Sequence, residues 1–293
     1  MPVKIKKAVF PVAGMGTRFL PATKACPKEM LPVVDKPLIQ YAVEEAIAAG
    51  ITDLIFVTSW TKRPIEDHFD KSFELEYKLE QAGKQELLSI VKNILPKNVN
   101  CFYVRQQEAL GLGHAVLCAR DIVGNEPFTV LLADDMIYCE NKPCLNTMVD
   151  LAMDSSSSVV AVEQVPMDRV NNYGVIDPVT ISKRLYKLQG VVEKPPADQA
   201  PSNLSIVGRY VLQPEIFGLL ENTQQGAGGE IQLTDAIADL LKEQDVLAYE
   251  FDGIRYDCGS KLGHMKANIE YALRHPKLNG EFRKYLQSLK LEA

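Results

Sequence analysis

The chain contains 293 residues, of which 46% are hydrophobic and 24% are charged. A chain of this size forms one large α/β domain or two ordinary ones, and it buries a core without disulfide support. The composition excludes disordered, collagen-like and small disulfide-rich proteins. A formal net charge of −6 has the wrong sign for binding nucleic acid through bulk electrostatics. Any anion site must therefore be built from a few local cations.

The cysteines and the N-terminal segment indicate the compartment. The apolar stretch 8–13 follows several lysines, but it is too short for a signal peptide or a membrane span. A chain of this length does not need a disulfide framework. We therefore expect a cytoplasmic protein without membrane association. Its six cysteines lack metal-ligand spacing and are predicted to be reduced thiols: Cys26, Cys101, Cys118, Cys139, Cys144 and Cys258.

The first half of the chain alternates between predicted strands and helices. A helix is expected at 39–47, because apolar residues recur at helical spacing and Gly50 follows, and a second helix is expected from Leu112. The segment 62–97 is too long for one crossover helix and is predicted to be a helical insertion. This order predicts right-handed crossovers and a mostly parallel sheet with helices on both faces. The apolar runs typical of buried strands are 9–13, 54–57, 101–104 and 128–133.

The second half contains more closely spaced strands. A helix at 232–242 interrupts them, two helices begin near Lys261 and Glu281, and the serine run 155–158 is predicted to be a surface turn. We expect one continuous domain over 1–293. Its parts are a nucleotide-binding half at about 1–158, a β-rich second-substrate half at about 159–260 and C-terminal helices at about 261–293. The predicted strands of the second half are 159–165, 173–176, 185–193, 205–212 and 247–251.

A glycine-containing loop follows the first predicted strand. The sequence Gly14-Met15-Gly16-Thr17-Arg18 lets the backbone approach a ligand, and its amides and Arg18 can neutralise phosphate oxygens. A dinucleotide fingerprint requires glycine where Phe19 stands, and a P-loop requires Gly-Lys-Ser/Thr. The glycines alone are also compatible with a simple tight turn. The long loop 20–32 is typical of a functional segment and supplies Lys28 as a second cation.

Ordered motifs over nearly the whole chain extend this interpretation. They are the run 14–41 and the segments 65–70, 106 with 111–115, 132–135, 172–174, 192–195, 228–235 and 256–260. Together they resemble the sugar-nucleotide pyrophosphorylase family, and the run 14–41 with the helical insertion favours its uridylyl branch. The resemblance implies a Rossmann-like mixed, mainly parallel central sheet flanked by helices, with a β-rich sugar-binding half and C-terminal helices. It further implies Mg²⁺-dependent transfer of UMP from UTP to glucose 1-phosphate, giving UDP-glucose and pyrophosphate, in a homodimer or homotetramer.

Two acidic positions are matched to the metal of the family. Asp134 and Asp135 follow the predicted strand 128–133, and consecutive strand side chains point to opposite faces, so we expect only one to face the site. The resemblance selects Asp134, and a carboxylate at a strand end facing a triphosphate suits Mg²⁺. Asp135 is expected to be structural. Asp257 matches the second acid near the metal, with a hydrogen bond to the turn 259–260 as the alternative.

The remaining site residues also follow from the resemblance. Gln106 suits a uracil edge because an amide both donates and accepts hydrogen bonds. Backbone amides of Gly174 and Gly208 are expected to reach the sugar, and His114 is expected only to pack at a helix start. The cations assigned to catalysis are Arg18, Lys28 and Lys194. The nucleotide-binding residues are Ala13, Gly14, Gly16, Glu29, Gln106 and Gly111. The sugar-binding residues are Gly174, Glu193, Gly208, Gly229 and Glu230.

The predicted mechanism is a single in-line displacement without a covalent intermediate. The attacking phosphate is ionised at neutral pH, so no general base is expected. One alternative is a sister nucleotidyltransferase that uses dTTP or another hexose 1-phosphate. Another is a sugar-nucleotide-binding protein without activity. An aspartyl phosphatase is excluded because its DxDxT pattern is absent.

Overall fold

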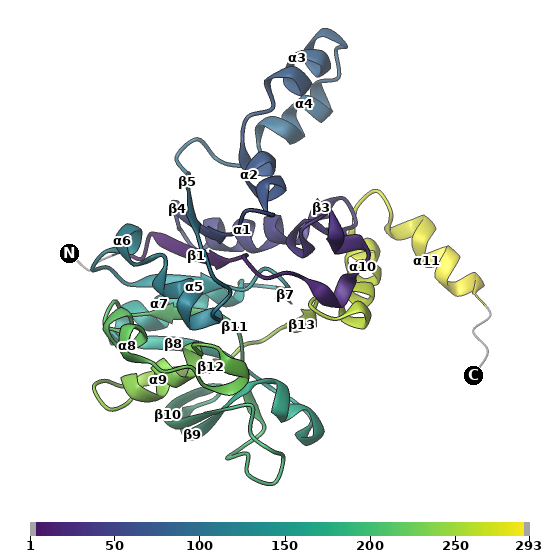
Figure 1. Cartoon of the computed structure of the whole chain (residues 1–293). Helices are drawn as coiled ribbons and strands as arrows, with labels where there is room; N and C mark the ends of the chain where they lie inside the picture. The colour runs from purple at the N-terminus through teal and green to yellow at the C-terminus, as the bar shows by residue number, and fades with distance from the viewer. Residues whose placement is uncertain (1–3, 290–293) are drawn as a thin grey trace.

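A nine-stranded sheet forms the centre of the protein, which a computed structural model describes over residues 4–289 (Figure 1). Residues 290–293 of the predicted C-terminal helical segment lie outside this range. The strand order is β5-β4-β1-β6-β11-β8-β12-β10-β9, and β11 and β10 run opposite to the other strands. The predicted mixed, mainly parallel sheet is confirmed. Its strands are β1 Lys7–Pro11, β4 Asp53–Thr58, β5 Asn100–Arg105, β6 Phe128–Leu131, β8 Ser158–Gln164, β9 Gly174–Ser182, β10 Leu185–Glu193, β11 Leu204–Leu212 and β12 Val246–Glu250.

Helices cover both faces of the sheet because its strands carry buried apolar side chains on both sides. On one face, Val9 and Ile55 pack with the apolar residues of α5, α6, α8 and α9. On the other face, Phe10 and Phe56 pack with α1, α2 and α7. Burial on two faces explains why these strands are continuous apolar runs. The helices are α1 Leu38–Ala48, α2 Arg63–Phe69, α5 Leu112–Leu117, α6 Arg120–Val123, α7 Cys144–Ser155, α8 Ile216–Asn222 and α9 Leu233–Leu240.

The predicted helical insertion is present and extends away from the sheet. Helix α2 packs Ile65 into the core, whereas α3 Phe73–Gln81 and α4 Gln85–Lys92 form a hairpin that projects from the body (Figure 1). Large apolar side chains remain exposed on this hairpin, for example Phe73 at 70% and Ile90 at 60%. Among the described residues, no helix combines the length and the apolar character needed to cross a membrane.

Some elements differ from the prediction. Helices α7 and α8 were not predicted, and the run 155–158 is more than a surface turn. Ser158 is fully buried as the first residue of β8, and its hydroxyl oxygen accepts a hydrogen bond from the amide of Gln213 at 3.0 Å. The strand predicted at 128–133 ends at Leu131, because the chain turns at Ala133 and Asp134.

A small antiparallel pair beside the main sheet presents several acidic side chains. Strand β7 Asp135–Tyr138 pairs with β13 Ile254–Asp257, so that Asp135 lies opposite Asp257. Met136 and Tyr256 anchor the pair in a separate apolar cluster with the next helix, α10 Lys261–Arg274. The hydroxyl of Ser260 caps α10 by accepting from the amide of Gly263 at 3.1 Å.

The remaining elements lie at the edges of the fold. Helix α11 Asn279–Ser288 follows α10 at the edge of the molecule (Figure 1). The minor strands β2 Pro32–Val33 and β3 Lys36–Pro37 form a hairpin before α1.

Candidate functional site

A cavity of about 980 Å³ opens at the carboxyl ends of β1 and β6 and extends to β9, β10 and β11. Most of the residues predicted for the site line it. They are Ala13, Gly14, Arg18, Lys28, Gln106, Gly111, Asp134, Gly174, Glu193, Lys194, Gly208, Glu230 and Asp257. Three predicted residues do not line it, namely Gly16, Glu29 and Gly229.

An ion pair joins the N-terminal loop to the turn after β6. The ammonium of Lys28, which lies in the 3-10 turn η3 Lys28–Met30, donates to Oδ2 of Asp134 at 2.6 Å. Burial disfavours the charged forms of both Lys28 and Asp134, but the attraction between the two charges outweighs this effect. The pKa of Lys28 is therefore raised and that of Asp134 is lowered. Gly16 supports this contact from outside the cavity lining, because a Cβ atom there would lie 3.1 Å from Cβ of Lys28.

The structure does not bring Glu29 into the cavity. Its carboxylate is 1% exposed and accepts from the ammonium of Lys62 at 2.8 Å. Lys62 immediately precedes α2, so the pair connects the insertion to the turn that carries Lys28. Burial raises the pKa of Glu29 despite the attraction of Lys62 and Lys28. The position of Glu29 is that of a buried support for the turn.

The acidic residues converge more closely than strand alternation predicts. Both Asp134 and Asp135 line the cavity, because Asp134 belongs to a turn and β7 begins only at Asp135. Asp134 and Asp257 meet at Gly259, where an added Cβ atom would lie 3.0 Å from Oδ2 of Asp134 and 3.0 Å from Oδ1 of Asp257. Arg18 reaches the same point, with NH1 3.5 Å from that position. A side chain at position 259 would therefore crowd both carboxylates.

Asp257 makes the turn contact considered for it and lies at the cavity. Its Oδ1 atom accepts from the amide of Gly259 at 3.0 Å, which is the predicted turn contact. Its side chain also lines the cavity. Burial, followed by repulsion from Asp135, raises the pKa of Asp257. Asp257 is therefore a partly buried carboxyl close to two other acids, Asp134 and Asp135.

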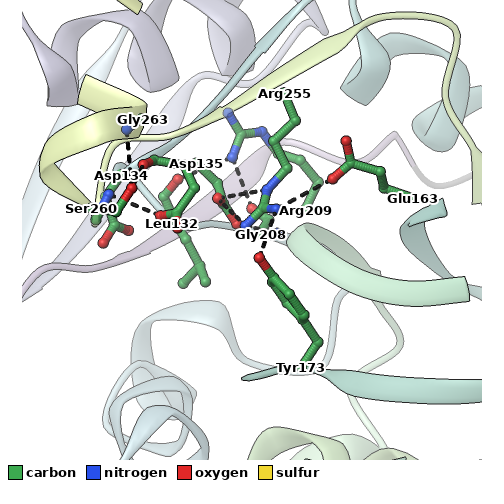
Figure 2. A network of polar contacts seen from close by, with 12 residues as sticks. Leu132, Asp134, Asp135, Glu163, Tyr173, Gly208, Arg209, Arg255, Ser260 and Gly263 are labelled. Atoms are coloured by element: carbon green, nitrogen blue, oxygen red, sulfur yellow. Dashed lines mark hydrogen bonds and ion pairs between the residues drawn. The ribbon is translucent and has the colours of Figure 1, made fainter. Parts of the chain in front are cut away.

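Asp135 is held by an arginine from β13. Arg255 donates from Nε to Oδ1 of Asp135 at 2.8 Å, while the amide of Gly208 donates to Oδ2 at 2.9 Å (Figure 2). Burial opposes the guanidinium charge, but attraction by Asp135 prevails and the pKa of Arg255 is raised. Because the Gly208 amide is bound to Asp135, it is not free to reach a sugar as predicted.

The amide of Gln106 has a defined orientation. Its Nε2 atom donates to the carbonyl of Gly111 at 3.1 Å and lies 3.1 Å from Nδ1 of His114. A carbonyl oxygen only accepts, so the amide nitrogen must face Gly111. No donor to Oε1 of Gln106 occurs among residues 4–289, which leaves this oxygen as an acceptor at the cavity wall.

The second-half residues form the opposite wall of the cavity. Lys194 lies 3.2 Å from Oε1 of Glu193, at the end of β10. Gly174 lies so close to Thr234 and Glu193 that an added Cβ atom would contact both, at 2.9 and 3.2 Å. A Cβ atom added to Gly111, whose φ is 101°, would likewise lie 2.7 Å from the Cβ atom of Glu230. The predicted nucleotide and sugar residues are therefore in direct contact along one side of the cavity.

The prediction missed several residues of the cavity wall. They include Arg255, Asp135, Arg169, Thr234 and Tyr210. Arg255 could have been predicted from Asp257. The two residues lie two positions apart in β13, and residues at i and i+2 of a strand share a face. Thr234 lies in the motif 228–235, although no role was predicted for it, and no local pattern marks Tyr210, which resembles an ordinary strand residue.

The acidic corner of the cavity offers few protein ligands for a metal ion. Within the part of the chain that the structure describes, no group of three or more His, Cys, Asp or Glu side chains is arranged to hold a metal ion. The pair of carboxylates at Gly259 matches instead the common Mg²⁺ arrangement, in which one or two carboxylates act together with substrate phosphates.

Comparison with known proteins places this site in a family. A profile described as "Nucleotidyl transferase" matches residues 7–272. The UTP–glucose-1-phosphate uridylyltransferase of Bacillus subtilis (strain 168) is 53% identical over 286 residues, which cover 98% of this chain and 97% of the relative. A structure of UTP-bound UGPase from Acinetobacter baumannii is 49% identical and superposes with a TM-score of 0.92 over 98% of this chain and 100% of that one.

A further structure, of a UDP-glucose pyrophosphorylase complexed with UDP-glucose, is 45% identical with a TM-score of 0.85, over 92% of this chain and 100% of that one. The matches in sequence and in structure both extend over almost the entire chain. The chain therefore belongs to the nucleotidyl transferase family, in which it is similar over nearly its full length to UTP–glucose-1-phosphate uridylyltransferases.

Proposed function

We propose that the protein transfers UMP from UTP to glucose 1-phosphate, producing UDP-glucose and pyrophosphate. The observation that carries the proposal is the composition of the cavity wall. Arg18, Lys28 and Lys194 line one cavity together with Asp134 and Asp257. This arrangement suits two phosphate-bearing substrates that repel each other. The relatives named for this activity, including one bound to UTP and one bound to UDP-glucose, support the assignment.

The nucleotide occupies the side of the cavity formed by the first half of the chain. Ala13 and Gly14 offer main-chain contacts to the nucleoside, and Oε1 of Gln106 accepts from the N3–H group of uracil. Cytosine carries an acceptor at the same ring position, so this oxygen disfavours CTP. Arg18 and Lys28 neutralise the triphosphate.

Glucose 1-phosphate occupies the opposite side. Glu193 accepts hydrogen bonds from sugar hydroxyls, and the ammonium of Lys194 pairs with the phosphate. Gly174 leaves room for the sugar ring, and Glu230 closes the pocket beside Gly111. The half at about 1–158 is thus the nucleotide half, and the half at about 159–260 is the sugar-phosphate half.

The reaction is an in-line displacement at phosphorus. An oxygen of the sugar phosphate forms a bond to the α-phosphorus of UTP, while the bond from that phosphorus to the bridging oxygen breaks and pyrophosphate leaves. The attacking oxygen is already ionised, so the residues here need only align the two substrates and reduce their repulsion. Since one phosphoanhydride replaces another, we expect the reaction to run in both directions.

The acidic pair at Gly259 fits a Mg²⁺ ion. The carboxylates of Asp134 and Asp257 approach the same point, where Oδ2 of Asp134 and Oδ1 of Asp257 each lie 3.0 Å from the position of a Cβ atom added to Gly259. When bound, the ion supplies positive charge to the triphosphate. Lys28 is already paired with Asp134, so it holds this carboxylate in an ionised, oriented state.

A pyrophosphate-release assay tests the proposal. UTP, dTTP, CTP and GTP are each combined with glucose 1-phosphate, galactose 1-phosphate and mannose 1-phosphate, with Mg²⁺ present. We expect UTP with glucose 1-phosphate to give the highest kcat/KM. Preference for dTTP or for another hexose 1-phosphate would assign the chain to a sister transferase. Binding of UDP-glucose without turnover of any pair would assign it to a non-catalytic sugar-nucleotide-binding protein.

A further inference from the structure

Arg255 contacts groups from both sides of the cavity. Its side chain is 8% exposed, comes from β13 and lines the cavity wall. The guanidinium donates to Asp135 from Nε at 2.8 Å and from NH2 at 2.7 Å, and NH1 donates to Glu163 at 3.2 Å and to the hydroxyl of Tyr173 at 3.3 Å. Figure 2 shows Arg255 between these three partners. Asp135 adjoins Asp134, whereas Glu163 and Tyr173 belong to the second half of the chain.

The contacts with Asp135 fix one end of this connection. Both oxygens of Asp135 are engaged, because Oδ1 accepts from Arg255 and Oδ2 accepts from the amide of Gly208. The guanidinium is therefore held at a defined distance from the turn that carries Asp134. Lysine has one nitrogen in place of the planar arginine fork, so it would not reach Asp135, Glu163 and Tyr173 together.

The contacts with Tyr173 fix the other end. Besides the hydrogen bond to the hydroxyl, the guanidinium lies over the ring, with Cζ 5.1 Å from its centroid. The carbonyl of Tyr173 accepts from the amide of Lys194 at 2.9 Å. The backbone of Tyr173 therefore helps to hold the backbone of Lys194, next to the ladder pairing of Glu193 with Gly174.

Lys194 needs this support because its backbone is strained. Its φ is 47°, in the left-handed region that a residue with a side chain rarely adopts. Such a conformation persists only where the surrounding structure holds it. In this conformation the ammonium lies beside Glu193, at 3.2 Å.

We propose that Arg255 is a positioning residue for the sugar phosphate. It acts through Tyr173 to hold Lys194 in the conformation that pairs with the phosphate of glucose 1-phosphate. The inference deepens the proposed function and rests on it. It predicts a loss confined to sugar-phosphate recognition, because the nucleotide contacts at Gln106 and Arg18 do not depend on Arg255.

The test measures KM for both substrates in the variants Arg255→Lys and Tyr173→Phe. We expect Arg255→Lys to raise the KM for glucose 1-phosphate about tenfold and to change the KM for UTP by less than about twofold. Tyr173→Phe removes only the hydroxyl and keeps the ring and the carbonyl, so we expect an increase of about threefold for glucose 1-phosphate. Because Tyr173→Phe is a small change, it gives the result even if Arg255→Lys folds poorly.

A double-mutant cycle tests whether Arg255 acts through Lys194. In the Lys194→Ala background the ammonium is gone, so we expect Arg255→Lys to raise the KM for glucose 1-phosphate by less than about twofold further. Full multiplication of the two effects would mean that Arg255 acts independently of Lys194 and would overturn the proposal.

Arg274→Lys is the matched control. Arg274 also stacks on a tyrosine, Tyr138, at 4.2 Å and pairs with an acid, Glu270, at 2.9 Å, but it lies outside the cavity lining. We expect both KM values to stay within about twofold of wild type. Equal increases for UTP and glucose 1-phosphate in Arg255→Lys, or no increase in either cavity variant, would overturn the positioning role. Inactive wild-type protein would instead refute the proposed function.

Discussion

At the scale of single residues, many ionised side chains at and near the cavity form short-range pairs of opposite charge. Lys28 pairs with Asp134 and Arg255 with Asp135, so the cations are neutralised in part by the acids that surround them. Lys62 pairs with Glu29 beneath the loop that carries Lys28. The net charge of −6 therefore does not describe the cavity, where the local field is set by these pairs and by Arg18, which also lines it.

The first prediction concerns Asp134. The variant Asp134→Asn keeps the shape of the side chain but removes the charge that pairs with Lys28 and suits a cation. We expect kcat to fall by roughly 100- to 1000-fold with little change in Tm. Steady-state assays and thermal melts provide the measurement. Asp252→Asn is the control, since Asp252 is an exposed acid that pairs with Arg184. Near-normal turnover of Asp134→Asn would contradict the assignment.

The second prediction concerns the buried pair beneath the loop. Lys62→Met leaves Glu29 buried without its cation, and we expect the free energy of unfolding to fall by about 3–5 kcal/mol. Urea denaturation measures this loss. Replacing Glu29 with Gln in the same variant should recover part of it, because the uncompensated charge is then removed.

The pH dependence of Lys62→Met gives a sharper check. Burial raises the pKa of Glu29 in the folded protein, so the folded state binds this proton more tightly than the unfolded chain. The corresponding stability is present at low pH and is lost as pH rises through the raised pKa. Loss of Lys62 raises that pKa further. The destabilisation should therefore be greater at about pH 8 than at about pH 5, and a pH-independent loss would contradict the interpretation.

At the scale of elements, close contacts between loops from the two halves shape the cavity. The amide of Gly113 donates to the carbonyl of Ile231 at 2.8 Å, and the amide of Ile231 donates to the carbonyl of Leu110 at 2.7 Å. These bonds tie the start of α5 to the segment before α9. The loop that carries Gly111 is consequently fixed by residues far away in the sequence.

The third prediction tests this connection with glycine variants. Gly111→Ala places a Cβ atom 2.7 Å from Glu230 at a φ of 101°, so we expect a loss of about 1–3 kcal/mol in stability and weaker UTP binding. Gly218 lies inside α8 with nothing within 4 Å of an added Cβ, so Gly218→Ala should be neutral or stabilising by up to about 1 kcal/mol. Chemical denaturation and UTP titration distinguish the two. Equal stability of both variants would contradict the role of Gly111.

The elements predicted well from sequence are those with strong local patterns. The bounds predicted for β10, 185–193, match the structure, and the helical insertion and the C-terminal helices are present. Helix α7 was missed although Leu145, Met148 and Ala152 fall at helical spacing, because polar residues dilute the pattern. Strand β7 was missed because its first residue is Asp135, and a charged side chain does not indicate a buried strand. The burial of Asp135 depends on its ion pair with Arg255.

Site residues were predictable where a sequence motif lies directly after a predicted strand. They were not predictable where the direction of a side chain or amide depends on a partner far away in the sequence. Glu29 adjoins Lys28, but burial against Lys62, 33 residues away, directs it out of the cavity. We expected the amide of Gly208 to be free to contact a sugar, but it donates a hydrogen bond to Asp135 of another strand. Such pairings are set by the tertiary fold, so a local pattern does not contain them.

At the scale of the whole molecule, apolar surface remains on the outer helices. Leu262 and Met265 on α10 are 65% and 57% exposed, so in the single chain they do not cover the sheet. The exposure of these apolar side chains favours contact with another subunit. A homodimer or homotetramer remains the prediction.

The fourth prediction concerns this surface. The double variant Leu262→Glu/Met265→Glu should reduce the molar mass measured by light scattering after gel filtration, because charge at an apolar contact opposes association. Ile181→Glu on β9, where Ile181 is 53% exposed, is the control and should leave the mass unchanged. A monomeric wild-type protein, or an unchanged mass in the double variant, would refute the expectation.

The position of β11 restricts how the enzyme moves during turnover. This strand is hydrogen-bonded to β6 on one side and to β8 on the other, with a register shift between Ile206 and Tyr210, so it joins the two halves of the sheet. A hinge motion that swings one half away from the other would have to tear backbone pairing, at a cost comparable to unfolding the sheet core. Rearrangement during turnover is therefore expected in loops outside this ladder and not between the two halves of the sheet.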